Sequence, residues 1–373
     1  MKTCRPDLPF EVISNPEFLS AGTAISDLVS PSRVLIGSQQ TTNGRLAAAA
    51  LERVYSWVHP SKVMHTNTYS SELAKLVANA MLAQRISSIN SISAICEKTG
   101  ADINEISNAV GADSRIGAQY LKAGIGFGGS CFGKDIRSLV YLAETLGLPE
   151  VAEYWQQVLS INDWQVSRFA RKVVQKMNGT LVGKKIAVLG YAFKKGTDDT
   201  RESPALNGIR ILLEDTPREV AIYDPFCDPC LVRKEIESHC GSEVLKQNGG
   251  PVEVYGNAYE ACAQSHAVIV MTDCDEFSNR AVSTFLPPLD KSRGTIQAMK
   301  EPGCGDNCLE CRVEKEKATK EFAGKERVDW AKVAYHLQKP RWVLDGRGIL
   351  DVTEMEKLDV RVEAIGRVSW GGL

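Results

Sequence analysis

The sequence predicts an α/β protein in three parts: the end of an α/β unit (1–66), a helical domain (67–179) and a parallel-sheet domain (180–373). Two observations support this division. A stretch over 71–98 contains neither proline nor glycine, as a long helix requires. After Gly183, continuous apolar runs that end in polar turns recur, which is the pattern of strands buried on both faces of a parallel sheet.

The first part contains strand-like and helical patterns in alternation. Strands are predicted over 10–13, 33–37 and 62–65, and a helix over 46–57. These are too few elements for a complete sheet, so we expect the chain to enter this unit near its end.

The second part is predicted to be almost wholly helical. Thr68 or Ser70 can cap the long helix, with Glu72 in its first turn. Another helix is predicted to begin at Pro149 and to stop at Asn178-Gly179, which gives it a length of about 45 Å. A helix of that length usually packs against a partner helix or connects domains.

The third part repeats the pattern of a buried strand followed by a polar turn. The predicted strands cover 185–190, 220–225, 267–272 and 341–346. Ligands of such sheets bind beyond the carboxyl ends of the strands. The candidates there are Phe193, Lys194, Arg201 and Arg347. An irregular segment over about 278–327, rich in Lys, Glu, Gly and Cys, is predicted to be an exposed insertion.

Composition excludes several classes of protein. The 44 basic and 46 acidic residues give a net charge of −2, which is no footprint for nucleic acid or an anionic membrane. No apolar run approaches the ~20 residues that span a bilayer, and no signal-peptide core follows Met1. The 11 cysteines do not form an evident disulfide framework. We therefore expect a cytoplasmic protein with reduced thiols.

One cysteine stands out by its position. Residues 126–135 place Cys131 on a glycine-rich turn directly before an apolar-periodic helix, with Asp135 one turn further on the same face. A helix N-terminus favours the thiolate, the form that attacks carbonyl carbon. The alternative is a buried, inert cysteine, which is the common state of a free thiol. The neighbouring Lys134 and Asp135 favour function.

Lys75 and Asn79 are four residues apart on the long helix and therefore face the same way. A cation and an amide on one stripe could stabilise an oxyanion. Spacing alone favours a solvated helix face instead, because polar pairs at this spacing are common on helix surfaces.

Other motifs are weaker. Gly124, Gly126 and Gly129 match Gly-x-Gly-x-x-Gly, but no strand is predicted before them, so we reject a dinucleotide fingerprint. The strand that ends at Gly190 has the right context and only one well-placed glycine, which leaves at most a variant phosphate site.

Redox and metal sites are also weakly indicated. Cys227 and Cys230 have Cys-x-x-Cys spacing, and three cysteines of the insertion could form part of a zinc site: Cys304, Cys308 and Cys311. The five histidines form no recognisable pair, so a thiol hydrolase or acyltransferase using Cys131 lacks an evident base.

Taken together, several segments resemble the UDP-glucose/GDP-mannose dehydrogenase family in order and spacing, over nearly all of the chain except the insertion and the extreme ends. These segments are 14–19, 66–76, 84–91, 128–131, 192–195 and 200–203. The resemblance implies a Rossmann-like N-terminal domain represented by its end, a central helical domain and a C-terminal Rossmann-like parallel-sheet domain. It also implies two-step, NAD-dependent oxidation of UDP-glucose to UDP-glucuronate.

The resemblance assigns roles residue by residue. Cys131 would trap the aldehyde as a thiohemiacetal that becomes a thioester, and Lys75 and Asn79 would stabilise the oxyanions. Asp135 would position or activate water, and Glu17 would assist thioester hydrolysis.

Binding residues follow from the same resemblance. Those matching substrate-binding positions are Phe18, Leu19, Arg115, Lys122, Phe127, Gly128, Phe193, Lys194 and Arg347. Lys134 and Arg201 match residues near the cofactor NAD. In the family, the residue matching Arg115 reaches the substrate of a neighbouring subunit, which implies a homo-oligomer.

Three departures from the family pattern matter. Most of the NAD-binding domain is expected to be missing, Ala21 stands in place of a cofactor-contacting glutamate, and Gly133 replaces a common glutamine. The alternative function is therefore a catalytically incompetent module that binds UDP-sugar or associates with other subunits.

Overall fold

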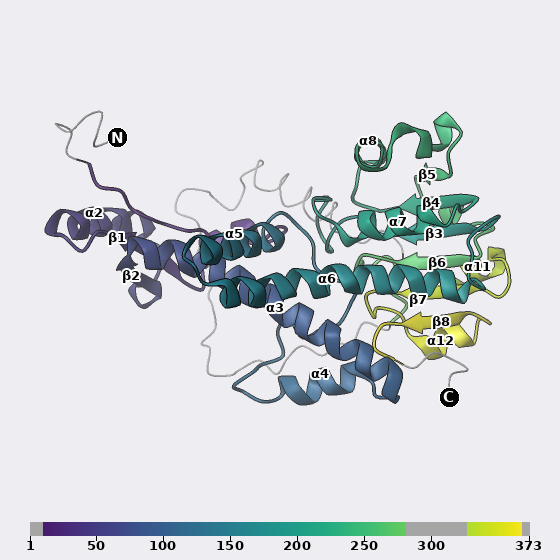
Figure 1. Ribbon diagram of the computed structural model, residues 1–373, viewed down its shortest axis with the longest axis horizontal. Coiled ribbons are helices and arrows are strands. Elements are labelled where there is room, and N and C mark those ends of the chain that lie inside the picture. The colour runs from purple at the N-terminus through teal and green to yellow at the C-terminus, as the bar shows by residue number, and fades with distance from the viewer. Residues whose placement is uncertain (1–9, 281–326, 368–373) are drawn as a thin grey trace, which may run out of the picture.

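The computed structural model describes residues 10–280 and 327–367 and has an α/β fold with parallel sheets. Figure 1 shows the N-terminal elements at one end and a larger sheet at the other, with two long helices running between them. The expected insertion lies mostly outside the described residues, as do Cys304, Cys308 and Cys311. Within the described ranges, no helix is long and apolar enough to cross a membrane.

A small parallel sheet forms the N-terminal end. Strands β1 (Val34–Ser38) and β2 (Val63–Asn67) pair side by side, and helix α2 (Thr42–Glu52) connects them, with a 3₁₀ turn over Arg53–Tyr55. Two of the three predicted strands are thereby confirmed, and the predicted helix is found a few residues earlier.

The strand predicted over 10–13 is wrong. Only Ser14 pairs with the sheet, through an antiparallel bridge to Gly37. Pro16 has no backbone N–H to donate to a ladder, so the pairing at Ser14 cannot continue along the residues that follow it. Helix α1 (Ala24–Val29) follows and buries none of its residues.

Four helices follow the small sheet. They are α3 (Thr68–Thr99), α4 (Ile103–Gly111), α5 (Phe132–Thr145) and α6 (Pro149–Lys176). The cap of α3 is Asn67, whose side chain accepts the Ser70 N–H, rather than Thr68 or Ser70 as predicted. Gly100 ends α3 with a φ of 86°, a left-handed conformation that glycine adopts without a steric penalty.

Helices α3, α5 and α6 share one apolar core. Its buried members are Ala80, Ala83, Phe127, Ile136, Leu139, Val158 and Leu159. Because α5 packs between the two long helices, the residue at its N-terminus is held against both of them. The predicted long helices are confirmed, and α6 spans about 42 Å at ~1.5 Å per residue.

The C-terminal part contains a six-stranded parallel sheet in the order β5-β4-β3-β6-β7-β8. Its strands are β3 (Lys185–Leu189), β4 (Glu219–Tyr223), β5 (Val252–Val254), β6 (Ala267–Val270), β7 (Trp342–Asp345) and β8 (Arg361–Ala364). The first strand lies in the middle of the sheet, so the order reverses between β3 and β6. Ligands of doubly wound sheets bind outside the carboxyl ends at such a switch point.

The four strands predicted in this part are confirmed, whereas β5 and β8 were not predicted. Strand β5 is only three residues long, and β8 contains Arg361 and Glu363 at alternate positions. Edge strands are short and charged, so neither gives the continuous apolar run of a central strand.

Helices cover both faces of this sheet. They are α7 (Pro204–Glu214), α8 (Pro229–Cys240), α9 (Ala258–Cys262), α11 (Trp330–His336) and α12 (Val352–Glu356), with 3₁₀ turns at Ser242–Val244 and Lys246–Asn248; a further 3₁₀ turn, Pro60–Lys62, precedes β2 of the small sheet. One apolar core lies on each face. Phe169 and Val173 of α6 belong to one of them, so this helix is shared between the helical part and the sheet.

Ion pairs fix the same contact. Glu97 of α3 accepts from Arg168 and Lys172 of α6 at 2.5 and 2.7 Å, and Lys172 also pairs with Glu363 of β8 at 3.0 Å. These side chains are largely buried, so removal of one partner would leave an uncompensated charge. The network therefore ties the long helices to the last strand of the sheet.

Gly346, directly after β7, lies where the sheet packs against the segment before Cys131, so a substitution there tests this packing. A Cβ on Gly346 would lie 2.4 Å from Ile125 Cγ2 and 2.7 Å from the Val270 oxygen, whereas nothing lies within 4 Å of a Cβ on Gly256. We expect Gly346→Ala to lower the free energy of unfolding by about 2 to 3 kcal/mol because of overpacking, and Gly256→Ala to change it little. Urea denaturation of both variants measures the difference, and equal midpoints would contradict the packing.

Candidate active site

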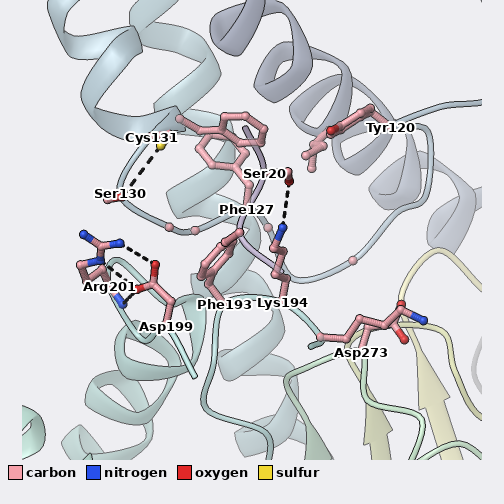
Figure 2. Close-up of a pocket in the computed structure, with 18 of the residues that line it drawn as sticks. Ser20, Tyr120, Phe127, Ser130, Cys131, Phe193, Lys194, Asp199, Arg201 and Asp273 are labelled. Atoms are coloured by element: carbon pink, nitrogen blue, oxygen red, sulfur yellow. Dashed lines mark hydrogen bonds and ion pairs between the residues drawn. The ribbon is translucent and has the colours of Figure 1, made fainter. Parts of the chain in front are cut away.

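A cavity of about 440 Å³ opens at the carboxyl ends of β3, β6 and β7. Its walls come from residues 19–21, the segment 120–132, the segment 193–201, and the turns that contain Asp273 and Arg347. Figure 2 shows how these side chains face the hollow from several parts of the fold. The cavity therefore lies where the doubly wound sheet predicts a ligand.

Buried amides of the long helices hold the glycine-rich wall of this cavity. Asn162 of α6 accepts the Phe127 N–H at 2.8 Å and donates to the Phe127 oxygen at 3.1 Å. Asn90 of α3 accepts the Gly124 N–H, and Gln165 donates to the Gly124 oxygen, at 2.9 and 2.8 Å. The N–H and oxygen of both Gly124 and Phe127 thus find partners, as burial requires.

Sequence reasoning missed these three amides. Asn90 and Gln165 have no exposed surface, and Asn162 has 8%. Their signal in the sequence is a polar residue within the apolar stripe of a long helix. Such residues are usually assigned to the surface, and only a partner loop distant in sequence explains them here.

Close approach requires glycine at two positions of the loop. Gly129 has a φ of 85°, and a Cβ there would lie 2.9 Å from the Phe193 ring. A Cβ on Gly128 would lie 2.3 Å from the Glu202 oxygen. The glycines therefore bring the loop against the segment after β3, rather than forming the dinucleotide fingerprint that we rejected.

Arg347 joins three of the walls. Its guanidinium donates to the oxygens of Met271, Gly126 and Phe193 at 2.7, 3.0 and 3.4 Å. Burial lowers the pKa of Arg347 to about 10, although the nearby charges of Asp273 and Asp345 act in the opposite direction. Predicted as a binding residue, Arg347 lines the cavity and also fixes its shape.

Cys131 lies at the N-cap position of α5 and faces the cavity. Its thiol is exposed, so the alternative of a buried cysteine is wrong. The sulfur lies 3.9 Å from Ser130 Oγ, and its backbone oxygen accepts the Asp135 N–H at 2.9 Å. The sulfur is thus presented at the start of a helix and is open to a ligand.

Lys75 points inward from α3 to the N-terminal segment. Its ammonium donates to the Glu17 backbone oxygen at 2.5 Å and to Glu17 Oε1 at 3.0 Å. The Lys75 side chain is only 19% exposed, so the interpretation of a solvated helix face is wrong. In the part of the chain that the structure describes, this ammonium binds Glu17 and forms no hydrogen bond with Cys131.

Neighbouring groups lower the pKa of the Glu17 carboxylate. Partial burial acts to raise the pKa of Glu17, but the Leu19 N–H, the Lys75 hydrogen bond and the charges of Lys75 and Lys134 outweigh it and lower the pKa. Phe18 lies beside this pair, with the Arg33 guanidinium 3.8 Å from its ring centre. Leu19 lines the cavity.

A second polar group lies one helical turn from Cys131. Asp135 is almost wholly buried and accepts from Asn79 Nδ2 at 2.6 Å, while Lys134 lies 3.3 Å from its other oxygen. Lys75 and Asn79 are one turn apart on α3, so the Lys75–Glu17 pair and the Asn79–Asp135 pair are neighbours. The structure therefore brings four of the five predicted catalytic residues into contact in two pairs.

Charged side chains form the cavity rim. Lys122 pairs with Asp273 at 2.8 Å, and Lys194 donates to Ser20 Oγ at 3.1 Å. Arg201 binds Asp199, whose hydrogen bonds raise the pKa of Arg201. Five cations line the cavity against the two carboxylates named here, among the described residues: Lys122, Lys194, Lys195, Arg201 and Arg347.

Some predicted residues lie apart from this cavity. The Arg115 side chain is 86% exposed, pairs with Asp113 and does not line the walls. Cys227 is buried and Cys230 exposed, and both thiols are free. The described ranges hold no group of three or more side chains that could bind a metal.

Comparison with known protein families finds three matches. Models of the UDP-glucose/GDP-mannose dehydrogenase family match the chain with their NAD binding domain over residues 2–59, their central domain over 69–164 and their UDP binding domain over 187–293. The expectation that most of the NAD-binding domain is missing finds no support in the first of these matches.

Curated relatives of this chain come from the same family. UDP-glucose 6-dehydrogenase 1 of Oryza sativa subsp. japonica is 42% identical over 97% of this chain and 67% of its own length. The Mus musculus UDP-glucose 6-dehydrogenase is 42% identical over 97% of this chain and 64% of its own. The Caenorhabditis elegans enzyme is 50% identical over 73% of this chain and 56% of its own. The chain thus spans about two thirds or less of these relatives.

Solved structures share the fold. A UDP-glucose dehydrogenase from Pyrobaculum islandicum superposes with a TM-score of 0.62 and 32% identity, over 72% of this chain and 57% of that one. A UDP-D-ManNAc dehydrogenase from Pyrococcus horikoshii has a TM-score of 0.65 at 21% identity, over 97% of this chain and 66% of that one. The second likeness concerns the fold alone.

Asn162 offers a test of how the cavity wall is held. In Asn162→Ala, the buried Phe127 N–H and oxygen lose their partners, each at a cost of ~1–3 kcal/mol. We expect an unfolding free energy lower by about 2 to 4 kcal/mol, measured by urea denaturation. Ser160→Ala on the exposed side of α6 is the matched control and should be nearly neutral. A loss below about 0.5 kcal/mol for Asn162→Ala would contradict the assignment.

The pH response of the Glu17–Lys75 contact follows from the lowered pKa of Glu17. Its stabilisation is present above the ordinary glutamate value of 4.5 and is lost as the pH falls through the lower folded value. We expect carboxyl NMR titration to give Glu17 a pKa below 4.5, and Lys75→Met to raise it. An unchanged Glu17 pKa in Lys75→Met would mean that the contact does not form in solution.

Proposed function

The chain belongs to the UDP-glucose/GDP-mannose dehydrogenase family, and we propose that it oxidises UDP-glucose to UDP-glucuronate in two NAD-dependent steps through a thioester on Cys131. The observation that most supports this proposal is the exposed Cys131 thiol on the wall of a cation-lined cavity. The sulfur is available for covalent chemistry, and the cations suit a diphosphate.

The substrate is proposed to lie along the carboxyl ends of β3, β6 and β7. Lys122, Lys194 and Arg347 place positive charge where the diphosphate would bind, while Phe193 offers an aromatic face. The loop around Phe127 and Gly128 would form the wall of the cavity beside the sugar. Leu19 lines the same cavity, and Phe18 beside it would help to shape the sugar end. This orientation directs the sugar C6 towards Cys131.

The residues present also suit the cofactor. Lys134 in the first turn of α5 and Arg201 on the cavity wall are exposed cations, and their charge fits the diphosphate of NAD. When bound, NAD accepts the hydride that leaves C6 in each oxidation. Ala21 on the cavity wall offers no carboxylate for a cofactor hydroxyl, where the family usually carries a glutamate.

The first oxidation removes a hydride and a proton from the C6 alcohol. The proton passes to a water that the Asp135 carboxylate positions. The Cys131 thiolate then adds to the aldehyde carbon, which forms the C–S bond of a thiohemiacetal and places negative charge on its oxygen. The Lys75 ammonium and the Asn79 amide stabilise this oxyanion. For this step Lys75 must exchange its contact with Glu17 for the substrate oxygen.

Loss of a second hydride from C6 turns the thiohemiacetal into a thioester. Water then attacks the thioester carbon, and Glu17 Oε1 or Oε2 accepts its proton. The C–S bond breaks, the thiolate of Cys131 leaves, and the carboxylic acid so formed loses its remaining proton to solvent to give the sugar carboxylate. Release of Glu17 from Lys75 in the preceding step frees this carboxylate to act as the base.

The exposed Arg115 suits the partner role that the family resemblance implies. Its guanidinium lies outside the cavity of its own chain, where it could reach the substrate of a second subunit. We therefore propose a homo-oligomer, with dimers as the smallest functional unit. Analytical ultracentrifugation of the purified chain distinguishes a dimer from a monomer directly.

The reaction predicts two NADH for each UDP-glucuronate formed by the purified chain. Cys131→Ser should lower steady-state turnover at least about a hundredfold, because a serine hydroxyl stays protonated at neutral pH and is then a far poorer nucleophile than a thiolate. Cys230→Ser is the matched control, since it removes another exposed thiol outside the cavity, and it should keep full activity.

Absorbance of NADH and chromatography of the nucleotide sugars measure both stoichiometry and rate. Full activity of Cys131→Ser would contradict the thioester route. UDP-glucose binding in calorimetry without any NADH formation would contradict the dehydrogenase and identify the chain as a UDP-sugar-binding module instead.

A further inference from the structure

Asp273 is a carboxylate in a cavity otherwise suited to anions. It follows strand β6 (Ala267–Val270) by three residues, so it emerges at the carboxyl end of the strand beside the topological switch point. Buried Thr272 fixes the turn, because its side chain packs where Gly190 has no Cβ. Figure 2 shows Asp273 on the opposite side of the pocket from the Asp199–Arg201 pair.

The two carboxylates that line the cavity, among the described residues, differ in their partners. Asp199 binds Arg201 through both oxygens, at 2.9 and 2.8 Å, within its own loop. Asp273 instead reaches across the cavity rim to Lys122, which precedes it by 151 residues, through one oxygen at 2.8 Å. The Asp273–Lys122 pair therefore connects the segment before the glycine loop to the sheet.

The Asp273–Lys122 ion pair is weak enough for a ligand to displace. The Lys122 side chain is 54% exposed and that of Asp273 is 34% exposed, so solvent screens their attraction. A lysine ammonium is a point charge on a flexible stem, which can turn to another anion without loss of geometry. By contrast, the Arg347 guanidinium is fixed by three backbone oxygens and cannot follow a ligand.

A diphosphate that binds Lys122 must come close to the Asp273 carboxylate, because the two side chains are in contact. The negative charges of the phosphate and of the nearby Asp273 carboxylate repel each other. When the phosphate binds the Lys122 ammonium, the Asp273–Lys122 ion pair breaks. Asp273 thus acts against nucleotide binding at the same time as it holds Lys122 in the rim.

We propose that Asp273 is a displaceable counter-ion: it holds Lys122 at the cavity rim and yields it to the diphosphate of the UDP-sugar. Its charge sets how firmly the nucleotide is held and hence how readily the product leaves. This inference rests on the proposed function, since it takes a nucleoside diphosphate as the ligand.

The test compares the affinity of UDP and of uridine for four proteins by isothermal titration calorimetry. These are the wild type, Asp273→Asn, the charge-keeping Asp273→Glu and the control Asp359→Asn. Asp359 is 80% exposed and pairs with Arg341 at 2.9 Å, and neither residue lines the cavity, so its removal changes the net charge equally without freeing a cavity cation. Thermal melting of each variant verifies the fold.

We expect Asp273→Asn to bind UDP about threefold to tenfold more tightly, because Lys122 no longer has to leave a competing anion. Uridine has no phosphate, so its affinity should change less than twofold. The gain should vanish in about 1 M salt, where the screening length is roughly 3 Å. Asp273→Glu and Asp359→Asn should bind UDP as the wild type does.

Equal or weaker UDP binding by Asp273→Asn would overturn the proposal. Weaker binding of both UDP and uridine would identify Asp273 as an acceptor for a nucleoside hydroxyl or N–H, which also overturns it. If the wild type itself binds no UDP, the proposed function fails together with this inference. If the wild type binds UDP and Asp273→Asn binds it with the same affinity, only the counter-ion proposal is refuted and the proposed function stands.

Discussion

The contact of the Arg347 guanidinium with three backbone oxygens is the constraint on which the cavity depends. The oxygens belong to the glycine loop, to the turn after β3 and to the turn after β6, so a single side chain sets the distance between them. The Ile125 N–H adds a bond to the Gly346 oxygen beside it. Because the carbonyls meet one planar cation, the loop cannot move independently of the sheet.

The position of Cys131 follows from this constraint and from the long helices. Asn162 and Gln165 of α6 hold the loop before the cysteine, while the apolar core between α3, α5 and α6 holds the helix after it. The sulfur is thus fixed from both sides and still exposed. A nucleophile held in this way loses little conformational freedom when it reacts, which is the advantage of preorganisation.

Ion pairs join the charged side chains that we propose for catalysis. Lys75 binds Glu17, and Lys134 lies beside Asp135, so each cation already has a carboxylate neighbour. Each pair can open towards a substrate oxygen or a water, and the cost is small because the outer member of each pair is exposed to solvent. A ligand that binds at these pairs would exchange existing contacts for new ones.

Periodicity alone determined the long helices, the four central strands and the thiol at a helix start, because apolar spacing and glycine turns are local signals. It did not give β5 and β8, which are short edge strands, or the buried amides Asn90, Asn162 and Gln165. Only the tertiary structure decided that Lys75 faces inward and that Arg347 holds three segments together. These facts depend on partners more than fifty residues away, and a local pattern contains no information about them.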